Sequence, residues 1–316
     1  MVENTRFGVA MRNFTRAPEE PNAQEIIDYG VHMEELGFDS VWVWDHILLG
    51  TDPYFPILDS LSLITAVAAR TKKIKVGTGI LVMPLRNPVL LAKQLSSIDQ
   101  ISGGRLMLGT AAGWYKREFD AVGVPFHRRG KIMDRNLDIL TELWTKDQVT
   151  GEWDEHVLRR AVMYPKPVQK PRPPLLIGGY VEPVLKRAGT RGDGWLTYFY
   201  QPEAFTRSWT KIRNYAEEAG RDPDSLTSLN QLAIYVGPRD KVAEPMNEWL
   251  NSDWDISSGS ESTYDSAIMG TPEECAEQLR AHLDTGLKKI IFVPYRYERE
   301  QVEVIAKEVI PLALKG

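Results

Sequence analysis

An aspartate and a histidine, Asp45 and His46, come directly after an apolar stretch formed by residues 39–44. This stretch is short and rich in valine and tryptophan, which favours a buried β-strand. Polar residues at the carboxyl end of a buried strand are where barrel enzymes carry their chemistry. Because an imidazole can exchange a proton near neutral pH, the pair could serve an acid–base step. The alternative is a structural histidine that caps the end of the strand.

A second candidate is the turn Gly178-Gly179, which follows the apolar residues Leu175–Ile177 and precedes a helix beginning near Tyr180. Free backbone N–H groups at the start of a helix, together with its positive end, favour an anion. The turn is therefore a plausible phosphate site, or else a plain connection between strand and helix. Barrels more often bind phosphate after their seventh and eighth strands, so this position departs from the general rule.

The elements that must position these residues are clearest between Lys73 and Trp114. A β-branched strand at 74–82 is followed by a helix that Asn87 can cap, that Pro88 suits at its first position, and that Gly103-Gly104 ends. A second strand at 105–110 then runs into a glycine-rich segment. This is a βαβ unit, which predicts two parallel strands and backbone that comes close to a ligand at their carboxyl ends.

The same alternation is found along most of the chain. Further strands are expected at 7–11, 39–44, 175–177, 192–198, 229–236 and 289–293. Eight strands alternating with helices in roughly 300 residues point to a (β/α)8 TIM barrel, with a doubly wound sheet as the alternative. We expect one domain covering residues 1–316, with insertions at about 145–173 and 251–269, the latter a mobile loop.

Composition narrows the class of protein. The chain has 316 residues, a net charge of −5 and a single cysteine, Cys275. There is no basic field for nucleic acid, no apolar run of the roughly 20 residues that a membrane helix needs, and no room for a signal peptide before the first strand. A lone cysteine fits a reducing cytoplasm, where it is expected to be a small buried apolar residue. The default is a soluble, cytoplasmic protein that acts on a small molecule.

With the strands placed, the sequence resembles the bacterial luciferase-like superfamily of oxidoreductases that use FMN or the deazaflavin F420. The resemblance covers nearly the whole chain, and its motifs are weak singly but specific in this order. They are Gly37–Val43 with Asp45-His46, Val76–Ile80, Gly104–Gly109 running into Gly113-Trp114 and Glu118-Phe119, Pro174–Gly179, Gly192–Trp195 and Gly270–Glu274.

The resemblance implies that the mouth of the barrel holds the flat ring of the cofactor. In many relatives the third strand carries a non-proline cis peptide bond, and the matching bond here is Gly79-Ile80, with Ile80 as an apolar support behind the ring. Thr110, at the end of the fourth strand, is assigned to the same site. Gly178, Gly179 and Tyr180 correspond to the turn that contacts the cofactor's phosphate in the family.

The resemblance also places His46 beside the reactive face of the ring, as the group that manages the proton in hydride transfer. Asp45 would orient that imidazole or accept a hydrogen bond from the cofactor; otherwise it caps a turn. Some deazaflavin-dependent sugar-phosphate dehydrogenases carry an acid where this chain has Trp114, so their proton-donor role does not transfer to this position. An aromatic pocket for a planar or apolar substrate is expected from Trp44, Trp114, Trp195 and Tyr198, each of which could instead belong to the core.

Several functions compete. The resemblance implies either F420-dependent hydride transfer to or from a small organic substrate, or an FMN-dependent monooxygenase that receives reduced FMN from a separate reductase. The Asp45-His46 pair favours F420, because oxygen-using relatives more often have Glu-His. A non-catalytic flavin-binding protein is a distant alternative. Metal-dependent or Schiff-base chemistry is disfavoured, because the five histidines are scattered and no lysine ends a strand. We expect no metal, and a homodimer.

Overall fold

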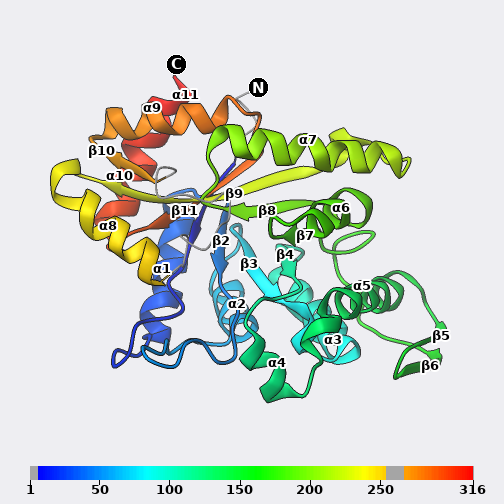
Figure 1. Ribbon diagram of the computed structural model, residues 1–316. Coiled ribbons are helices and arrows are strands. Elements are labelled where there is room, and N and C mark those ends of the chain that lie inside the picture. Colours follow the sequence, from blue (N-terminus) through cyan, green and yellow to red (C-terminus); the bar gives the residue numbers. More distant parts are fainter. Residues whose placement is uncertain (1–5, 254–266, 316) are drawn as a thin grey trace. The chain divides into compact units, whose positions relative to one another are not determined.

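The structure is a computed structural model that describes residues 6–253 and 267–315. Parallel strands alternate with helices along the chain (Figure 1). The strands are β1 (Arg6–Ala10), β2 (Ser40–Val43), β3 (Lys75–Val82), β4 (Leu106–Ala111), β7 (Leu175–Gly178), β8 (Gly194–Tyr198), β9 (Thr227–Val236) and β11 (Lys289–Pro294). They follow one another in the sheet in chain order, and β11 pairs with both β9 and β1. This is the (β/α)8 TIM barrel that the sequence predicts.

The chain forms two compact units. Unit 1 contains the described residues of 1–11, 29–42 and 176–316, and unit 2 contains residues 12–28 and 43–175. The description of a single domain stays a prediction. Asp45, His46 and the third and fourth strands belong to unit 2, whereas the Gly178-Gly179 turn belongs to unit 1.

Unit 2 is built around the predicted βαβ segment. Strands β3 and β4 are parallel neighbours, and helix α3 (Pro88–Ser102) joins them (Figure 1). The side chain of Asn87 accepts hydrogen bonds from the N–H groups of Val89 and Leu90, and Gly103 ends the helix with a φ of 66°. The cap and the left-handed terminal glycine are those expected from the sequence.

Unit 2 has further elements before and after these two strands in the sequence. They are α2 (Ser60–Arg70), η2 (Met83–Leu85), α4 (Lys116–Val122), η3 (Phe126–Arg128), α5 (Arg129–Thr145), β5 (Val149–Trp153) and β6 (His156–Ala161). Within the insertion expected at 145–173, β5 and β6 form an antiparallel hairpin beside α5 (Figure 1). The rest of the insertion has neither helix nor strand.

In unit 1, β1 pairs with β2 and β11, and β9 pairs with β8, β10 (Ile268–Gly270) and β11, all in parallel. The accompanying helices are α1 (Ala23–Glu35), which begins in unit 2, α6 (Glu182–Arg191), α7 (Pro202–Glu218), η4 (Pro223–Ser225), α8 (Arg239–Asp253), α9 (Pro272–Leu283), α10 (Arg299–Val304), the π-helical η6 (Ile305–Val309) and α11 (Ile310–Leu314). Helix α9 begins with the predicted capping box of Thr271 and Glu274. Cys275 is buried, as expected.

The second insertion predicted from the sequence covers residues 251–269. Its first residues belong to α8 and its last residues to β10, while residues 254–266 lie outside the described part of the chain. We predicted no helix at α8, whose pattern is interrupted by Pro245. In the part of the chain that the structure describes, no helix is both long and apolar enough to span a bilayer.

Candidate active site

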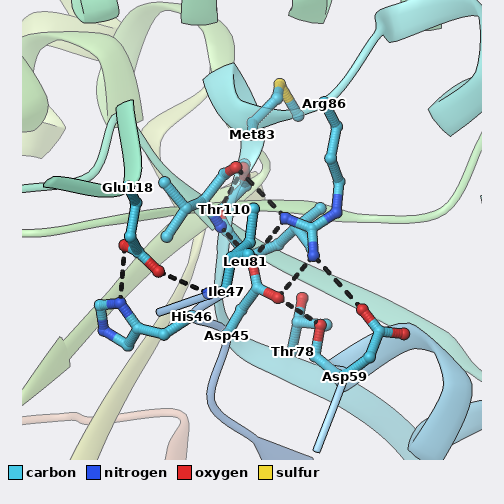
Figure 2. A network of polar contacts seen from close by, with 12 residues as sticks. Asp45, His46, Ile47, Asp59, Thr78, Leu81, Met83, Arg86, Thr110 and Glu118 are labelled. Atoms are coloured by element: carbon cyan, nitrogen blue, oxygen red, sulfur yellow. Dashed lines mark hydrogen bonds and ion pairs between the residues drawn. The ribbon is translucent and has the colours of Figure 1, made fainter. Parts of the chain in front are cut away.

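His46 lies three residues beyond the end of β2, and its imidazole faces a carboxylate from another part of unit 2 (Figure 2). The Nδ1 atom of His46 is 2.9 Å from Oε2 of Glu118. The histidine side chain is 14% exposed and the glutamate side chain only 1%. The two residues therefore form a pair in which one nitrogen of the ring is held by a buried acid.

Glu118 also binds the backbone that follows His46. Its Oε1 atom accepts hydrogen bonds from the N–H groups of Ile47 and Leu48, the latter at 3.1 Å. Glu118 lies in the first turn of α4, next to Phe119, whose fully buried ring packs with Val82 and Leu85. Burial of Phe119 fixes the helix, and this places the neighbouring carboxylate against the His46 loop.

Gly113 allows this approach of α4. Its φ is +83°, and a Cβ atom at this position would lie 2.6 Å from Val82 Cγ1 and 3.0 Å from the Phe119 ring. Only glycine meets both the backbone conformation and the lack of space. The Gly113-Trp114 motif therefore has a local structural reason, in addition to its place in the family resemblance.

Asp45 has different partners from His46. Its carboxylate accepts hydrogen bonds from Ser60 Oγ at 2.7 Å, from Val82 N at 2.8 Å, and from both Nη atoms of Arg86 at 2.7 Å each. Arg86 also lies 3.6 Å from Asp59, which caps α2 (Figure 2). A carboxylate has about four lone-pair positions. All four are used here, so Glu118, and not Asp45, binds the imidazole of His46.

The expected cis peptide bond between Gly79 and Ile80 is present. The pairing register of β3 with β4 shifts between Thr78 and Leu81, on either side of this bond. Thr78 Oγ1 donates to the carbonyl of Gly109 at 2.7 Å, and the hydroxyl of Thr110 donates to the carbonyl of Leu81 at 3.1 Å. Thr110 thus holds the irregular part of β3, and its role in binding a cofactor stays a prediction.

The predicted phosphate turn lies in unit 1, between β7 and α6. Gly179 has a φ of +116°, where an L side chain would be strained, and no side chain caps the start of α6. The one acid in the first turn, Glu182, is bound by Lys211 at 2.9 Å and by the hydroxyl of Tyr215. These hydrogen bonds lower the pKa of Glu182, that of Tyr215 being the larger cause.

The four aromatic residues predicted for the substrate pocket have different surroundings. In unit 2, Trp114 is 63% exposed, and its ring meets that of His46 edge to face with centroids 5.9 Å apart. Trp44 is buried and packs on Phe14.

In unit 1, Trp195 is completely buried, stacks on Phe205 and donates its indole N–H to the carbonyl of Gly179. Tyr198 is half-buried, and its ring lies 6.3 Å from that of Tyr180. Trp44 and Trp195 thus have the surroundings of core residues, whereas Trp114 presents its ring beside His46.

Sequence reasoning missed Glu118 and Arg86 as functional residues. Glu118 was noted only as part of a motif, although an acid four residues after Trp114 in a short helix was a usable signal. Nothing local marks Arg86 as the partner of Asp45. In the described ranges, 6–253 and 267–315, no three histidine, cysteine, aspartate or glutamate side chains form a group able to hold a metal ion.

The structure is thus a TIM barrel in which a histidine after the second strand is bound by a buried glutamate, and comparison with known proteins identifies the family. The profile of luciferase-like monooxygenases matches residues 5–289. The chain belongs to this family.

Two relatives have different activities. An F420-dependent glucose-6-phosphate dehydrogenase of Amycolatopsis mediterranei (strain U-32) is 26% identical over 331 residues, covering 94% of this chain and 97% of the relative. An FMNH2-dependent dimethylsulfone monooxygenase of Pseudomonas putida is also 26% identical, covering 80% of this chain and 78% of the relative.

Among solved structures, an F420-dependent secondary alcohol dehydrogenase in complex with an F420-acetone adduct matches with a TM-score of 0.84. The match covers 98% of this chain and 99% of that protein, at 23% identity. It confirms the fold.

Proposed function

We propose that the protein is an F420-dependent oxidoreductase that moves a hydride to or from a small alcohol or carbonyl compound, with His46 exchanging the proton. The observation that carries this proposal is the half-buried imidazole of His46, bound through Nδ1 to Glu118 and edged by the exposed ring of Trp114. Hydride transfer at a carbon that bears oxygen requires such a proton acceptor or donor nearby. Membership of the luciferase-like family supports redox chemistry at this position.

Each unit, taken by itself, has residues that fit one feature of such a cofactor, a flat ring in unit 2 and an anion in unit 1. For the ring, β3 offers the irregular Gly79-Ile80 segment with the half-buried side chain of Ile80. For a phosphate, the turn at Gly179 in unit 1 exposes backbone without a side chain, and Glu182 is engaged by Lys211 and Tyr215. When bound, F420 would supply the hydride acceptor or donor.

His46 would act directly on the substrate. With Nδ1 bound to Glu118, the other ring nitrogen, Nε2, is the one that can accept a proton from an alcohol or return it to a carbonyl. The ring of Trp114, which is 63% exposed, lies edge to face with this ring, and the next two residues of the chain, Ile47 and Leu48, are 42% and 51% exposed. We therefore propose a small, uncharged and largely apolar substrate, rather than the sugar phosphate named for the dehydrogenase relative.

The second candidate is an FMN-dependent two-component monooxygenase, which would use reduced FMN supplied by a separate reductase and molecular oxygen. The dimethylsulfone monooxygenase from Pseudomonas putida favours it, because the match covers most of both chains. The match to the F420-dependent dehydrogenase covers more of this chain, 94% against 80%, and this favours the first proposal. A non-catalytic flavin-binding protein remains the distant alternative, and the proton-transfer pair of His46 and Glu118 is the feature that speaks against it.

The domain organisation, compartment and oligomeric state of the enzyme are proposed on more general grounds. We propose a single-domain protein that works in the cytoplasm as a homodimer. The cysteine content supports a reducing compartment, since Cys275 is the only cysteine of the sequence and cannot form a disulfide within the chain. Size-exclusion chromatography with light scattering tests the dimer.

The test is a pair of spectroscopic titrations of the purified protein, one with F420 and one with FMN. We expect F420 to bind. We also expect its absorbance to change when an alcohol reduces the bound cofactor or when a ketone oxidises the reduced form. His46→Asn should bind the cofactor normally and lose turnover, while His127→Asn, which changes an exposed histidine of η3, should behave as wild type. Binding of FMN but not of F420 would favour the monooxygenase. Normal turnover by His46→Asn would show that His46 does not exchange the proton.

A further inference from the structure

We infer that Glu118 is a positioning residue that fixes the tautomer of His46, so that Nδ1 carries the hydrogen and Nε2 carries the lone pair. The inference deepens the proposed function and rests on it only where it concerns turnover. It assigns to Glu118 a task that is separate from binding cofactor or substrate.

The hydrogen-bond pattern of Glu118 dictates the tautomer. An ionised carboxylate can only accept hydrogen bonds, and a neutral imidazole has one donor and one acceptor nitrogen. Oε1 of Glu118 already accepts two backbone N–H groups, from Ile47 and Leu48. Such bonds stabilise the charged form of a carboxylate. The contact of 2.9 Å between Oε2 and the ring therefore has Nδ1 of His46 as the donor.

The negative charge of Glu118 also affects the protonated form of His46. Within residues 6–253 and 267–315, the carboxylate has no lysine or arginine partner, and its side chain is 1% exposed. A buried charge requires compensation. A proton taken up at Nε2 would give an imidazolium in direct contact with this carboxylate, which stabilises the proton on the ring just when the reaction places it there.

Asp45 cannot take over this task, although it precedes His46 in the sequence. Its oxygens are occupied by Ser60, by the backbone of Val82 and by Arg86. The guanidinium of Arg86 also compensates its charge, through two bonds of 2.7 Å. The two buried acids of this region thus have separate roles, because one neutralises an arginine and the other faces the imidazole.

Glu118→Gln separates the tautomer from the position of the loop. The glutamine carbonyl can still accept from the N–H groups of Ile47 and Leu48, but its amide nitrogen then faces Nδ1 of His46 as a donor. Nδ1 of His46 must then be the acceptor, so the ring hydrogen lies on Nε2. The change in shape is minimal, and the expected change in chemistry is an inverted tautomer.

The experiment is nitrogen NMR of protein labelled with 15N-histidine, without cofactor, at a pH where the ring is neutral. The His46 signals are assigned by their loss in His46→Asn. We expect the Nδ1–H tautomer in wild type and the Nε2–H tautomer in Glu118→Gln. Asp120→Asn, on the exposed side of the same helix, is the matched control and should leave the tautomer unchanged.

Turnover gives the second measurement. We expect kcat of Glu118→Gln to fall by about 100-fold or more, the range over which general acid–base groups act, with little change in cofactor affinity or KM. An Nε2–H tautomer in wild type overturns the inference, and this result does not depend on whether Glu118→Gln folds. An unchanged tautomer in a folded Glu118→Gln protein overturns it as well. A wild-type Nδ1–H tautomer combined with no turnover on either cofactor instead refutes the proposed function and leaves the tautomer assignment intact.

Discussion

Replacement of Arg86 by methionine should destabilise unit 2 through the buried charge of Asp45. The variant keeps much of the aliphatic side chain but removes two of the four donors to the carboxylate, both at 2.7 Å. Hydrogen bonds to charged groups contribute about 1.5–3 kcal/mol each, and breaking one side of a buried ion pair costs about 3–5 kcal/mol. Because Arg86 is 16% exposed and water can reach part of the vacated site, we expect a loss near the lower end, about 3 kcal/mol.

Equilibrium urea unfolding, followed by tryptophan fluorescence, measures this loss as a shift in midpoint at constant slope. Arg128→Met is the control, because Arg128 and Asp154 form an ion pair whose partners are 46% and 47% exposed, and such pairs contribute at most about 1 kcal/mol. In the background of Asp45→Asn, where the carboxylate that Arg86 neutralises is absent, the penalty of Arg86→Met should shrink by about 2 kcal/mol. A penalty below about 1 kcal/mol, or one that is equal in both backgrounds, would refute the reasoning.

Three further outcomes are expected. Gly113→Ala should cost about 1–3 kcal/mol more than Gly123→Ala, since both glycines have positive φ but only Gly113 lacks space for a Cβ atom; equal urea midpoints would contradict this. Trp114→Ala should raise the KM of an apolar substrate about 10-fold or more without lowering stability, whereas Leu90→Ala, at a more exposed apolar residue, should change neither. Burial lowers the pKa of His282 to about 4. An unfolded histidine binds protons below about pH 6.5, so His282 should remove up to about 3 kcal/mol of stability as the pH falls from 6.5 to 4; His282→Gln should flatten that slope, and an unchanged slope would exclude the effect.

The sequence predicts those features that depend on neighbouring residues. The cap at Asn87 and the terminal glycine at Gly103 are formed by residues at the two ends of one helix, and both are present. The cis bond at Gly79-Ile80 was predicted from the family resemblance, because no local pattern requires it. Helix α8 was missed because Pro245 interrupts the usual helical signal.

The two acid pairs could not be predicted for a different reason. His46 and Glu118 are 72 residues apart, and Asp45 and Arg86 are 41 apart, so each pair exists only once the strands and helices of unit 2 are packed. From the sequence, Asp45 was expected to orient the imidazole of His46, to accept a hydrogen bond from the cofactor or to cap a turn; in the structure its carboxylate binds Arg86 instead.

Because Asp45 and Glu118 have different partners, their charges act differently on the imidazole of His46. Asp45 and Arg86 together carry no net charge, so the Asp45 carboxylate contributes little to the field at the neighbouring imidazole. Among the residues that the structure describes, the partners of Glu118 are two backbone N–H groups and His46, so its negative charge acts on that ring at short range. Removing Arg86 would expose His46 to a second negative charge, whereas removing Glu118 would leave it with none.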